Sequence, residues 1–210
     1  MTRFMLSFIL LAVPTALRAQ SPLPIVEDVE WKTFRERTDK VLTALETLKA
    51  PLPADTLRAA KALLEKEEAT PQAAEAVQKL LDPYCLIGLS INPESRVKAV
   101  RGPAATELLQ NRETVLLIKV QNEAGVTQLP GVSGPQITSD KAGDGRWLKA
   151  VIAADEPLPR KLSGQRVDYV VLKLTALEAG KREATLKFDV GQGTQDLGFR
   201  AEVPILFRVK

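Results

Sequence analysis

The chain has 210 residues, 29 of them basic and 26 acidic, and it contains one cysteine and no histidine. Histidine is the usual side chain that titrates near neutral pH and the commonest metal ligand, so its absence excludes Ser-His-Asp or Cys-His catalysis and imidazole-based zinc sites. A single cysteine cannot form an intramolecular disulfide, so the fold depends on a hydrophobic core.

Residues 1–19 are predicted to be a signal peptide. Arg3 gives a basic start, Met5 to Leu17 form a mostly apolar run, and the small Ala19 offers a cleavage point. The alternative, a membrane anchor, needs about 20 apolar residues, more than this run supplies. We therefore expect an exported protein, periplasmic or extracellular, with no membrane span after cleavage.

The charge balance without this leader argues against a nucleic-acid partner. Removing Arg3 and Arg18 from the 29 basic residues leaves 27, against 26 acidic residues. Such a near-neutral chain, whose basic residues are scattered among acids, lacks the positive surface of a nucleic-acid binder.

Residues 20–83 are predicted to form a helical segment of about three helices. Apolar residues recur at steps of three and four between Val26 and Leu48, which places them on one stripe of a helix. A second helix is expected from Asp55 as N-cap, and a third from Thr70-Pro71, with proline at the first helical position. We expect these stripes to pack in a small bundle or on the next domain. The alternative is a coiled-coil dimer through the first stripe.

Residues 84–210 show the period-two alternation of half-buried strands. Strands are predicted at 114–121, 167–175, 184–190 and 203–209, with further candidates at 85–91 and 147–153. Gly125 and Gly180 are expected at positive φ in turns, the second closing a hairpin over residues 167–190. Pro204 suits an edge strand, and Cys85 is expected to be buried, with a disulfide-linked dimer as the alternative.

The predicted fold class is thus an α+β arrangement. The helical segment is followed by an antiparallel immunoglobulin-like β-sandwich over residues 84–210.

The glycine-rich stretch "DVGQGTQDLGF", residues 189–199, is interpreted as a connection between strands. A dinucleotide-binding loop has the spacing G-x-G-x-x-G and runs into a helix, but here the third glycine, Gly198, comes two places late and a strand follows. A calcium site using Asp189 and Asp196 is the alternative. The sequence predicts no catalytic, cofactor-binding or metal-binding residue, and no cofactor.

Two stretches go beyond generic patterning: "INPESRVKAVRGPAATELLQNRETVLLIKVQNEAGVT" (91–127) and "LSGQRVDYVVLKLTALEAGKREATLKFDVGQGTQDLGFRAEVPILF" (162–207). They resemble the non-catalytic region that lies upstream of PHP-type metallohydrolase domains in secreted bacterial proteins. The resemblance implies an accessory module. It carries over no catalytic residue, because this chain lacks the histidines that such a metal centre needs.

We predict a secreted or periplasmic, non-enzymatic binding or scaffolding protein whose partner is another protein or an envelope polymer. The alternatives are an accessory or remnant part of a metal-dependent hydrolase system, and a carbohydrate-binding module. The candidate interaction surface comprises polar residues of the first matched stretch and a tryptophan able to stack on a sugar: Asn92, Arg96, Arg101, Asn122, Glu123 and Trp147. Turn and strand-edge hydrogen bonding is the competing interpretation of the polar five, and a core position is the competing interpretation of Trp147.

Overall fold

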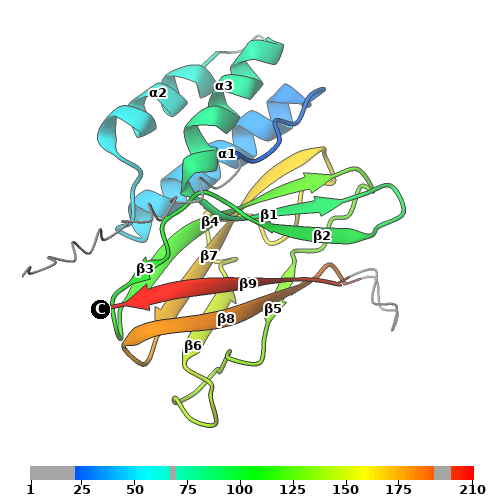
Figure 1. The fold of residues 1–210 in the computed structure, drawn as a ribbon. Helices are drawn as coiled ribbons and strands as arrows, with labels where there is room; N and C mark the ends of the chain where they lie inside the picture. The colour runs from blue at the N-terminus through cyan, green and yellow to red at the C-terminus, as the bar shows by residue number, and fades with distance from the viewer. Residues whose placement is uncertain (1–21, 67–69, 192–199) are drawn as a thin grey trace, which may run out of the picture.

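The computed structural model describes residues 22–66, 70–191 and 200–210, so the predicted signal peptide and most of the loop 189–199 lie outside the described residues. Three helices lie on one side of a pair of β-sheets (Figure 1). They are α1 (Trp31–Thr47), α2 (Ala54–Leu64) and α3 (Pro71–Leu81), followed by a 3-10 turn, η1 (Asp82–Tyr84). The change from helix to strand therefore falls between Tyr84 and Cys85.

The helix starts follow from capping. The carboxylate of Glu30 accepts hydrogen bonds from the backbone N–H groups of Lys32 and Thr33, which makes Glu30 the N-cap of α1. The helix thus begins at Trp31, and residues 22–30 before it have no regular secondary structure. Thr70 caps α3 by accepting from Ala73 N–H, as predicted. Asp55, predicted as the N-cap of α2, lies inside its first turn instead.

The described residues form nine strands in two sheets. The five-stranded sheet has the order β2-β1-β4-β7-β6, with bounds Val97–Arg101, Cys85–Ile91, Glu113–Asn122, Val167–Ala176 and Leu148–Ile152. The four-stranded sheet has the order β3-β9-β8-β5, with bounds Glu107–Leu108, Arg200–Val209, Gly180–Asp189 and Gly131–Ser133. All six strands predicted from the sequence are present, and the short strands β2, β3 and β5 are additional.

The helical part and the strand-rich part confirm the α+β class, but the prediction of antiparallel sheets was wrong in two places. Strands β1 and β4 pair in parallel, and so do β3 and β9. The chain leaves β1, forms β2 and β3, and re-enters beside β1 in the same direction as β4. Both sheets are therefore mixed, and the immunoglobulin-like arrangement is not confirmed.

The predicted hairpin over residues 167–190 was also wrong. Strand β7 belongs to the five-stranded sheet and β8 to the four-stranded sheet, so the turn at Gly180 carries the chain from one sheet to the other. Gly125 and Gly180 do have positive φ, at 68° and 112°. Strands β8 and β9 pair antiparallel with Asp189 opposite Arg200, so the loop 189–199 joins them as predicted.

Pro204 lies on β9, which has β3 and β8 as neighbours and is not an edge strand of the sheet, but β9 is unpaired on one side at Pro204. Thr185 of β8 lies opposite Pro204 of β9. The Thr185 N–H donates to the side chain of Gln136, so it does not donate to Pro204. On its other side β9 pairs with β3 at Arg208 and Val209, and no described strand pairs with Pro204 there.

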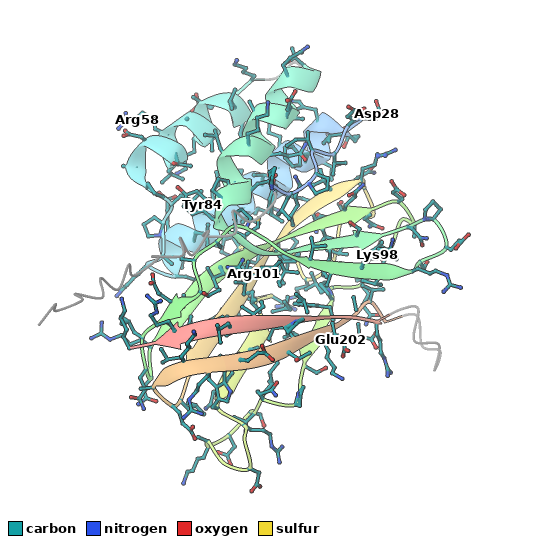
Figure 2. All side chains as sticks on the ribbon, viewed as in Figure 1. Asp28, Arg58, Tyr84, Lys98, Arg101 and Glu202 are labelled. Atoms are coloured by element: carbon teal, nitrogen blue, oxygen red, sulfur yellow. The ribbon has the colours of Figure 1, made fainter. Side chains whose placement is uncertain are left out.

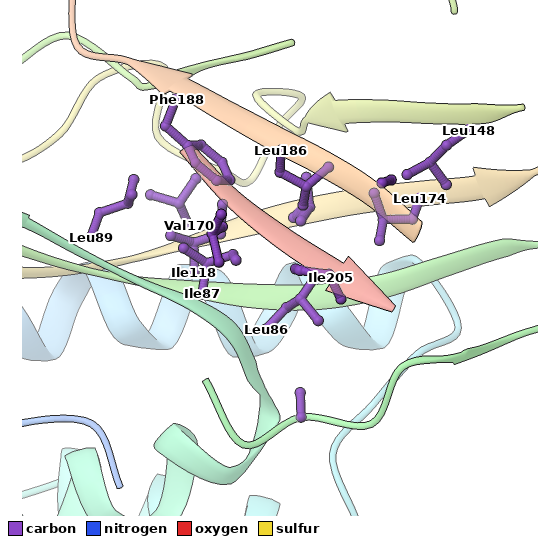
Figure 3. Close-up of a cluster of buried hydrophobic side chains, with 14 of the residues drawn as sticks. Leu86, Ile87, Leu89, Ile118, Leu148, Val170, Leu174, Leu186, Phe188 and Ile205 are labelled. Carbon is purple, nitrogen blue, oxygen red and sulfur yellow. The ribbon is translucent and has the colours of Figure 1, made fainter. Parts of the chain in front are cut away.

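Two hydrophobic cores share the five-stranded sheet. Between the sheets, side chains of Ile87, Ile118 and Val170 meet Leu186, Phe188 and Ile205 of the other sheet (Figure 3). On its opposite face, the same sheet packs against the helices through residues that include Phe34, Leu42, Val77, Cys85, Leu117 and Val171.

The burial of residues in this second core contradicts two alternatives considered from the sequence, both of them dimers. The stripe of α1 is buried within the chain, so the coiled-coil dimer through it was a wrong alternative. Cys85 has no exposed surface, which contradicts the disulfide-linked dimer.

Candidate functional site

A buried polar cluster lies where the helices meet the five-stranded sheet. The Lys119 ammonium on β4 lies 2.8 Å from the Asp82 carboxylate of η1, and the Tyr169 hydroxyl on β7 donates to the same carboxylate at 2.8 Å. Lys119 also donates to the backbone carbonyl of Pro24 at 2.8 Å. The cluster therefore ties a helix end, two strands and the irregular segment 22–30 together.

Burial dominates the ionisation of this cluster. Removal from water raises the pKa of Asp82 and lowers that of Lys119, and their mutual hydrogen bond opposes both changes. Burial likewise raises the pKa of Tyr169 and of the nearby Cys85 thiol well above their usual values. A nucleophilic cysteine needs a lowered pKa and an accessible sulfur, so Cys85 is a packing residue.

A second buried carboxylate, Asp168, anchors α1 to the loop that precedes β7. Arg37 on α1 donates to Asp168 at 2.7 Å, and the Ser163 hydroxyl and N–H donate to its other oxygen at 2.7 and 3.0 Å. Arg37 also donates to the carbonyl of Lys161. Burial raises the pKa of Asp168, and the hydrogen bonds from Ser163 oppose this rise. All these polar groups are satisfied by each other, as expected of structural clusters.

The segment 22–30 is held by its backbone as well as by its side chains. The Gln78 amide accepts from Val26 N–H at 2.8 Å and donates to Val26 carbonyl at 2.9 Å, with the Gln78 side chain fully buried. Leu23 packs over Gly88 of β1, where an added Cβ would lie 2.7 Å from the leucine side chain. The segment thus forms part of the helix–sheet core.

An apolar groove of about 480 Å³ opens at the junction of the helices and the sheet. Its walls come from the end of α1, the α1–α2 connection, η1, the loop after β2 and the start of β4. Every lining residue is aliphatic, proline or tyrosine; they include Leu45, Pro51, Pro53, Tyr84, Ala105 and Val115. Pro51, Pro53 and Ala105 are exposed on its rim, and Figure 2 shows Tyr84 at this junction.

Arg101 builds one wall of the groove. Its guanidinium donates to the backbone carbonyls of Leu86, Gly102 and Ala104, and so fixes the loop that carries Ala104 and Ala105 into the lining. Gly102 packs against β1 so closely that a Cβ there would lie 2.2 Å from the Cys85 carbonyl oxygen. The loop therefore has one position relative to the sheet.

The structure brings some, but not all, of the six residues of the predicted interaction surface together. Trp147 and Asn122 are buried, with 3% and 2% of their surface exposed, so their prediction as surface residues was wrong. Trp147 packs edge-on against Phe207, and Asn122 bonds both backbone groups of Val126.

The other four lie at or near the surface: Asn92, Arg96 and Glu123 lie together at the end of β1, and Arg101 lies at the far end of β2, opposite Ile87. Asn92 closes the β1–β2 turn by accepting from the N–H groups of Glu94 and Arg96, and Arg101 holds the loop described above. Arg96 and Glu123 are exposed, each facing its own ion partner, Glu94 and Arg166. Turn and loop bonding, the competing interpretation, accounts for Asn92, Arg101 and Asn122.

The groove was not predicted from the sequence. Its residues come from four separate segments, and an exposed proline or alanine has no distinctive pattern in a single sequence. Among the described residues, no group of three or more Cys, Asp or Glu side chains is placed to hold a metal ion. None of the described helices has the length and apolar character needed to cross a membrane.

Comparisons with known proteins add little. A scan of family models finds no match, and a search of curated proteins finds none. A solved structure described as "Structure of PbICP-C in complex with falcipain-2" is similar over 60% of this chain and 92% of that chain, with 13% identity and a TM-score of 0.28. A similarity this weak carries no argument about fold or function. The resemblance to the region upstream of PHP-type domains, and the signal peptide, stay predictions.

Proposed function

We propose that the chain is an exported, non-enzymatic binding protein that holds an apolar segment of a partner protein in the groove between its helices and its five-stranded sheet. The observation that carries this proposal is the lining of the groove, which is aliphatic, proline or tyrosine throughout although several of its residues reach the surface. Concave, apolar sites of a few hundred Å³ are the usual form of binding sites in proteins.

The position of the groove supports the same proposal. It lies where separate elements meet, and its loop wall is fixed by three backbone hydrogen bonds from Arg101. A preformed wall reduces the conformational entropy that the binding site itself loses when a ligand binds. We also propose that the two packed sheets are a nine-stranded variant of the immunoglobulin-like sandwich, a strand number that variable-type domains share.

The test is the binding of an uncharged apolar dye, Nile red, to the chain that begins at Gln20. Ala105→Asp places a charge on the groove rim, and Ala142→Asp makes the same change in the exposed loop before β6. We expect Nile red affinity to fall at least tenfold in Ala105→Asp and to stay unchanged in Ala142→Asp, because burying an unpaired carboxylate is unfavourable. Equal affinities in the two variants would contradict the groove as the binding site.

The non-enzymatic part needs its own measurement. The same chain is incubated with an activated phosphodiester and with an activated amide, in the presence of Mg²⁺, Mn²⁺ or Zn²⁺. We expect no hydrolysis above that of the metal alone, since the carboxylates of both buried clusters are engaged in structural bonds. Reproducible turnover that an acid-to-amide substitution abolishes would overturn this part of the proposal.

A further inference from the structure

Strand β4 extends beyond its neighbour β1 at the groove. It begins at Glu113, but its parallel pairing with β1 begins only at Leu117, because the chain before Cys85 is the 3-10 turn η1 and not a strand. Residues 113–116 of β4 therefore pair with β7 on one side and with no described strand on the other. This leaves an open stretch of sheet edge about 13 Å long.

The backbone of Val115 faces this open edge. Successive residues of a strand turn their N–H and C=O groups to opposite sides. Asn122 N–H donates to the residue before β7 at 2.9 Å, and Glu123 N–H donates to the last residue of β1 at 2.8 Å. The β4–β7 register is unbroken over residues 113–121, so Val115 faces the same side as Glu123. No described residue bonds its backbone there.

The groove follows this edge of β4 and not one face of the sheet. It contacts the three consecutive residues Val115, Leu116 and Leu117. Val115 and Leu117 pack in the helix–sheet core, whereas Leu116 packs in the core between the sheets, because neighbouring side chains of a strand point to opposite faces. A hollow that touches all three lies beside the strand, at the position of a pairing partner. The groove thus offers backbone groups as well as apolar surface.

The rim of the groove carries positive charge. Lys49 precedes the lining residue Ala50, and Arg112 directly precedes β4; both side chains are exposed. The nearby acid Glu113 is paired with Lys173 of β7 at 2.9 Å, whereas neither Lys49 nor Arg112 has an ion-pair partner among the described residues. A segment with carboxylates beside its apolar residues is complementary in charge to this rim.

We propose that an extended segment of the partner protein adds to β4 as a strand inside the groove, in line with β1, with acidic residues toward Lys49 and Arg112. This inference rests on the proposed function and defines the form of its ligand. Main-chain hydrogen bonds supply affinity in such strand addition, and alternate side chains enter the apolar lining. The open edge takes about four extended residues. The residue opposite Val115 needs an N–H group, which excludes proline.

The decisive experiment measures the binding of fluorescein-labelled peptides to the chain that begins at Gln20. The parent peptide is Asp-Asp-Val-Leu-Val-Leu-Asp-Asp. One derivative is N-methylated at both valines and the other at both leucines, so each lacks alternate N–H groups but keeps every side chain. Only one alternate set faces β4 in an added strand. We expect one derivative to lose about tenfold in affinity and the other to bind within about twofold of the parent.

Three results of this peptide series would overturn the proposal. They are an equal loss in both derivatives, no loss in either, and no binding of the parent peptide at about 1 mM. An apolar surface that held the side chains alone would not distinguish the two sets of N–H groups.

A variant of β4 tests the same contact from the side of the protein. Val115→Pro removes the N–H group at the open edge and leaves the β4–β7 hydrogen bonds, which use the residues before and after it. Val115→Ile keeps the N–H group and is the matched control. We expect parent-peptide affinity to fall about tenfold in Val115→Pro and to stay within about twofold in Val115→Ile. A folded Val115→Pro variant with unaltered affinity would contradict the proposal. If it does not fold, the peptide series on the wild-type chain decides.

The charged contacts have their own pair of variants. Lys49→Glu/Arg112→Glu reverses the charge of the rim, and Lys141→Glu/Arg146→Glu makes the same change in the exposed loop before β6. We expect the first double variant alone to lose affinity for the parent peptide and to bind a derivative with Lys-Lys at both ends more tightly than the wild type does. Equal affinities in the two double variants would contradict the orientation of the acidic residues.

The two proposals fail in different ways. If Ala105→Asp weakens Nile red binding but the two N-methylated peptides bind alike, the groove is the binding site and its ligand is not an added strand. If the peptides alternate and Val115→Pro weakens them while Ala105→Asp leaves Nile red binding unchanged, β4 accepts a strand and the apolar lining is not the dye site.

Discussion

Gly102 illustrates how one missing side chain fixes the position of a loop. A Cβ at this residue would lie 2.2 Å from the backbone oxygen of Cys85, and neither backbone can yield. We expect Gly102→Ala to lower the free energy of unfolding by about 1–3 kcal/mol or more, as overpacking does. The matched control is Gly143→Ala, where nothing lies within 4 Å and little change is expected. Urea unfolding of both variants measures the difference, and equal midpoints would contradict the close approach.

The buried carboxyl group of Asp168 predicts how the stability of the fold depends on pH. Burial raises the pKa of Asp168 above its value in the unfolded chain, so the folded state binds the proton more tightly. The contribution of this group to the free energy of unfolding is therefore greatest at low pH, and it is lost as the pH rises through the folded pKa. The stability advantage of the wild-type chain over Asp168→Asn should therefore be largest below about pH 4 and shrink toward neutrality. Denaturant titrations between pH 3.5 and 7 give this difference directly. An advantage that grows with pH would mean that Arg37 outweighs burial.

At the scale of elements, the Asp82–Lys119 pair joins η1 to β4. Removing one partner of a buried ion pair leaves an uncompensated charge, so Lys119→Met should cost about 3–5 kcal/mol. Adding Asp82→Asn should recover part of that loss, which a double-mutant cycle would show as a coupling above about 1 kcal/mol. In the exposed pair Lys187–Glu202, Lys187→Met should cost less than about 1 kcal/mol. If the losses of stability in Lys119→Met and Asp82→Asn simply added in the double variant, the two side chains would not be coupled.

Elements with a strong local pattern were predictable from the sequence, and those that depend on distant partners were not. The alternation in residues 184–190 and the Thr70-Pro71 start of α3 are local signals, and both elements are present. Strand β5 has three residues and exists because it pairs with β8. The period-two pattern of residues 167–175 predicted a strand correctly, but nothing in it shows that the next strand joins the other sheet.

The candidate site was less predictable for the same reason. Polar residues in a distinctive stretch were expected to form a surface, yet Asn122 turns inward to bond its own loop. The segment 22–30, which has no regular secondary structure, was predicted to be partly helical from the stripe that starts at Val26. Its backbone instead bonds Gln78, a residue 52 positions away that no local pattern identifies.

At the scale of the whole molecule, β9 completes both the four-stranded sheet and the core. It pairs with β8 along ten residues, and its Phe207 packs against Trp147 with ring centroids 6.0 Å apart. We expect a chain that ends at residue 199 to lose cooperative unfolding and the near-ultraviolet circular dichroism of Trp147. A synthetic peptide of residues 200–210, added in excess, should restore part of that signal. A truncated chain with an unchanged signal would show that the core closes without β9.

The parallel pairing of β3 with β9 has a kinetic consequence. These neighbours are about a hundred residues apart in the chain, so the loop between them must close before their contact stabilises anything. Folds dominated by such long-range pairings refold in about milliseconds to seconds, whereas helical bundles refold in about microseconds to milliseconds. During that interval the end of β9 that pairs with β3 presents an unpaired edge.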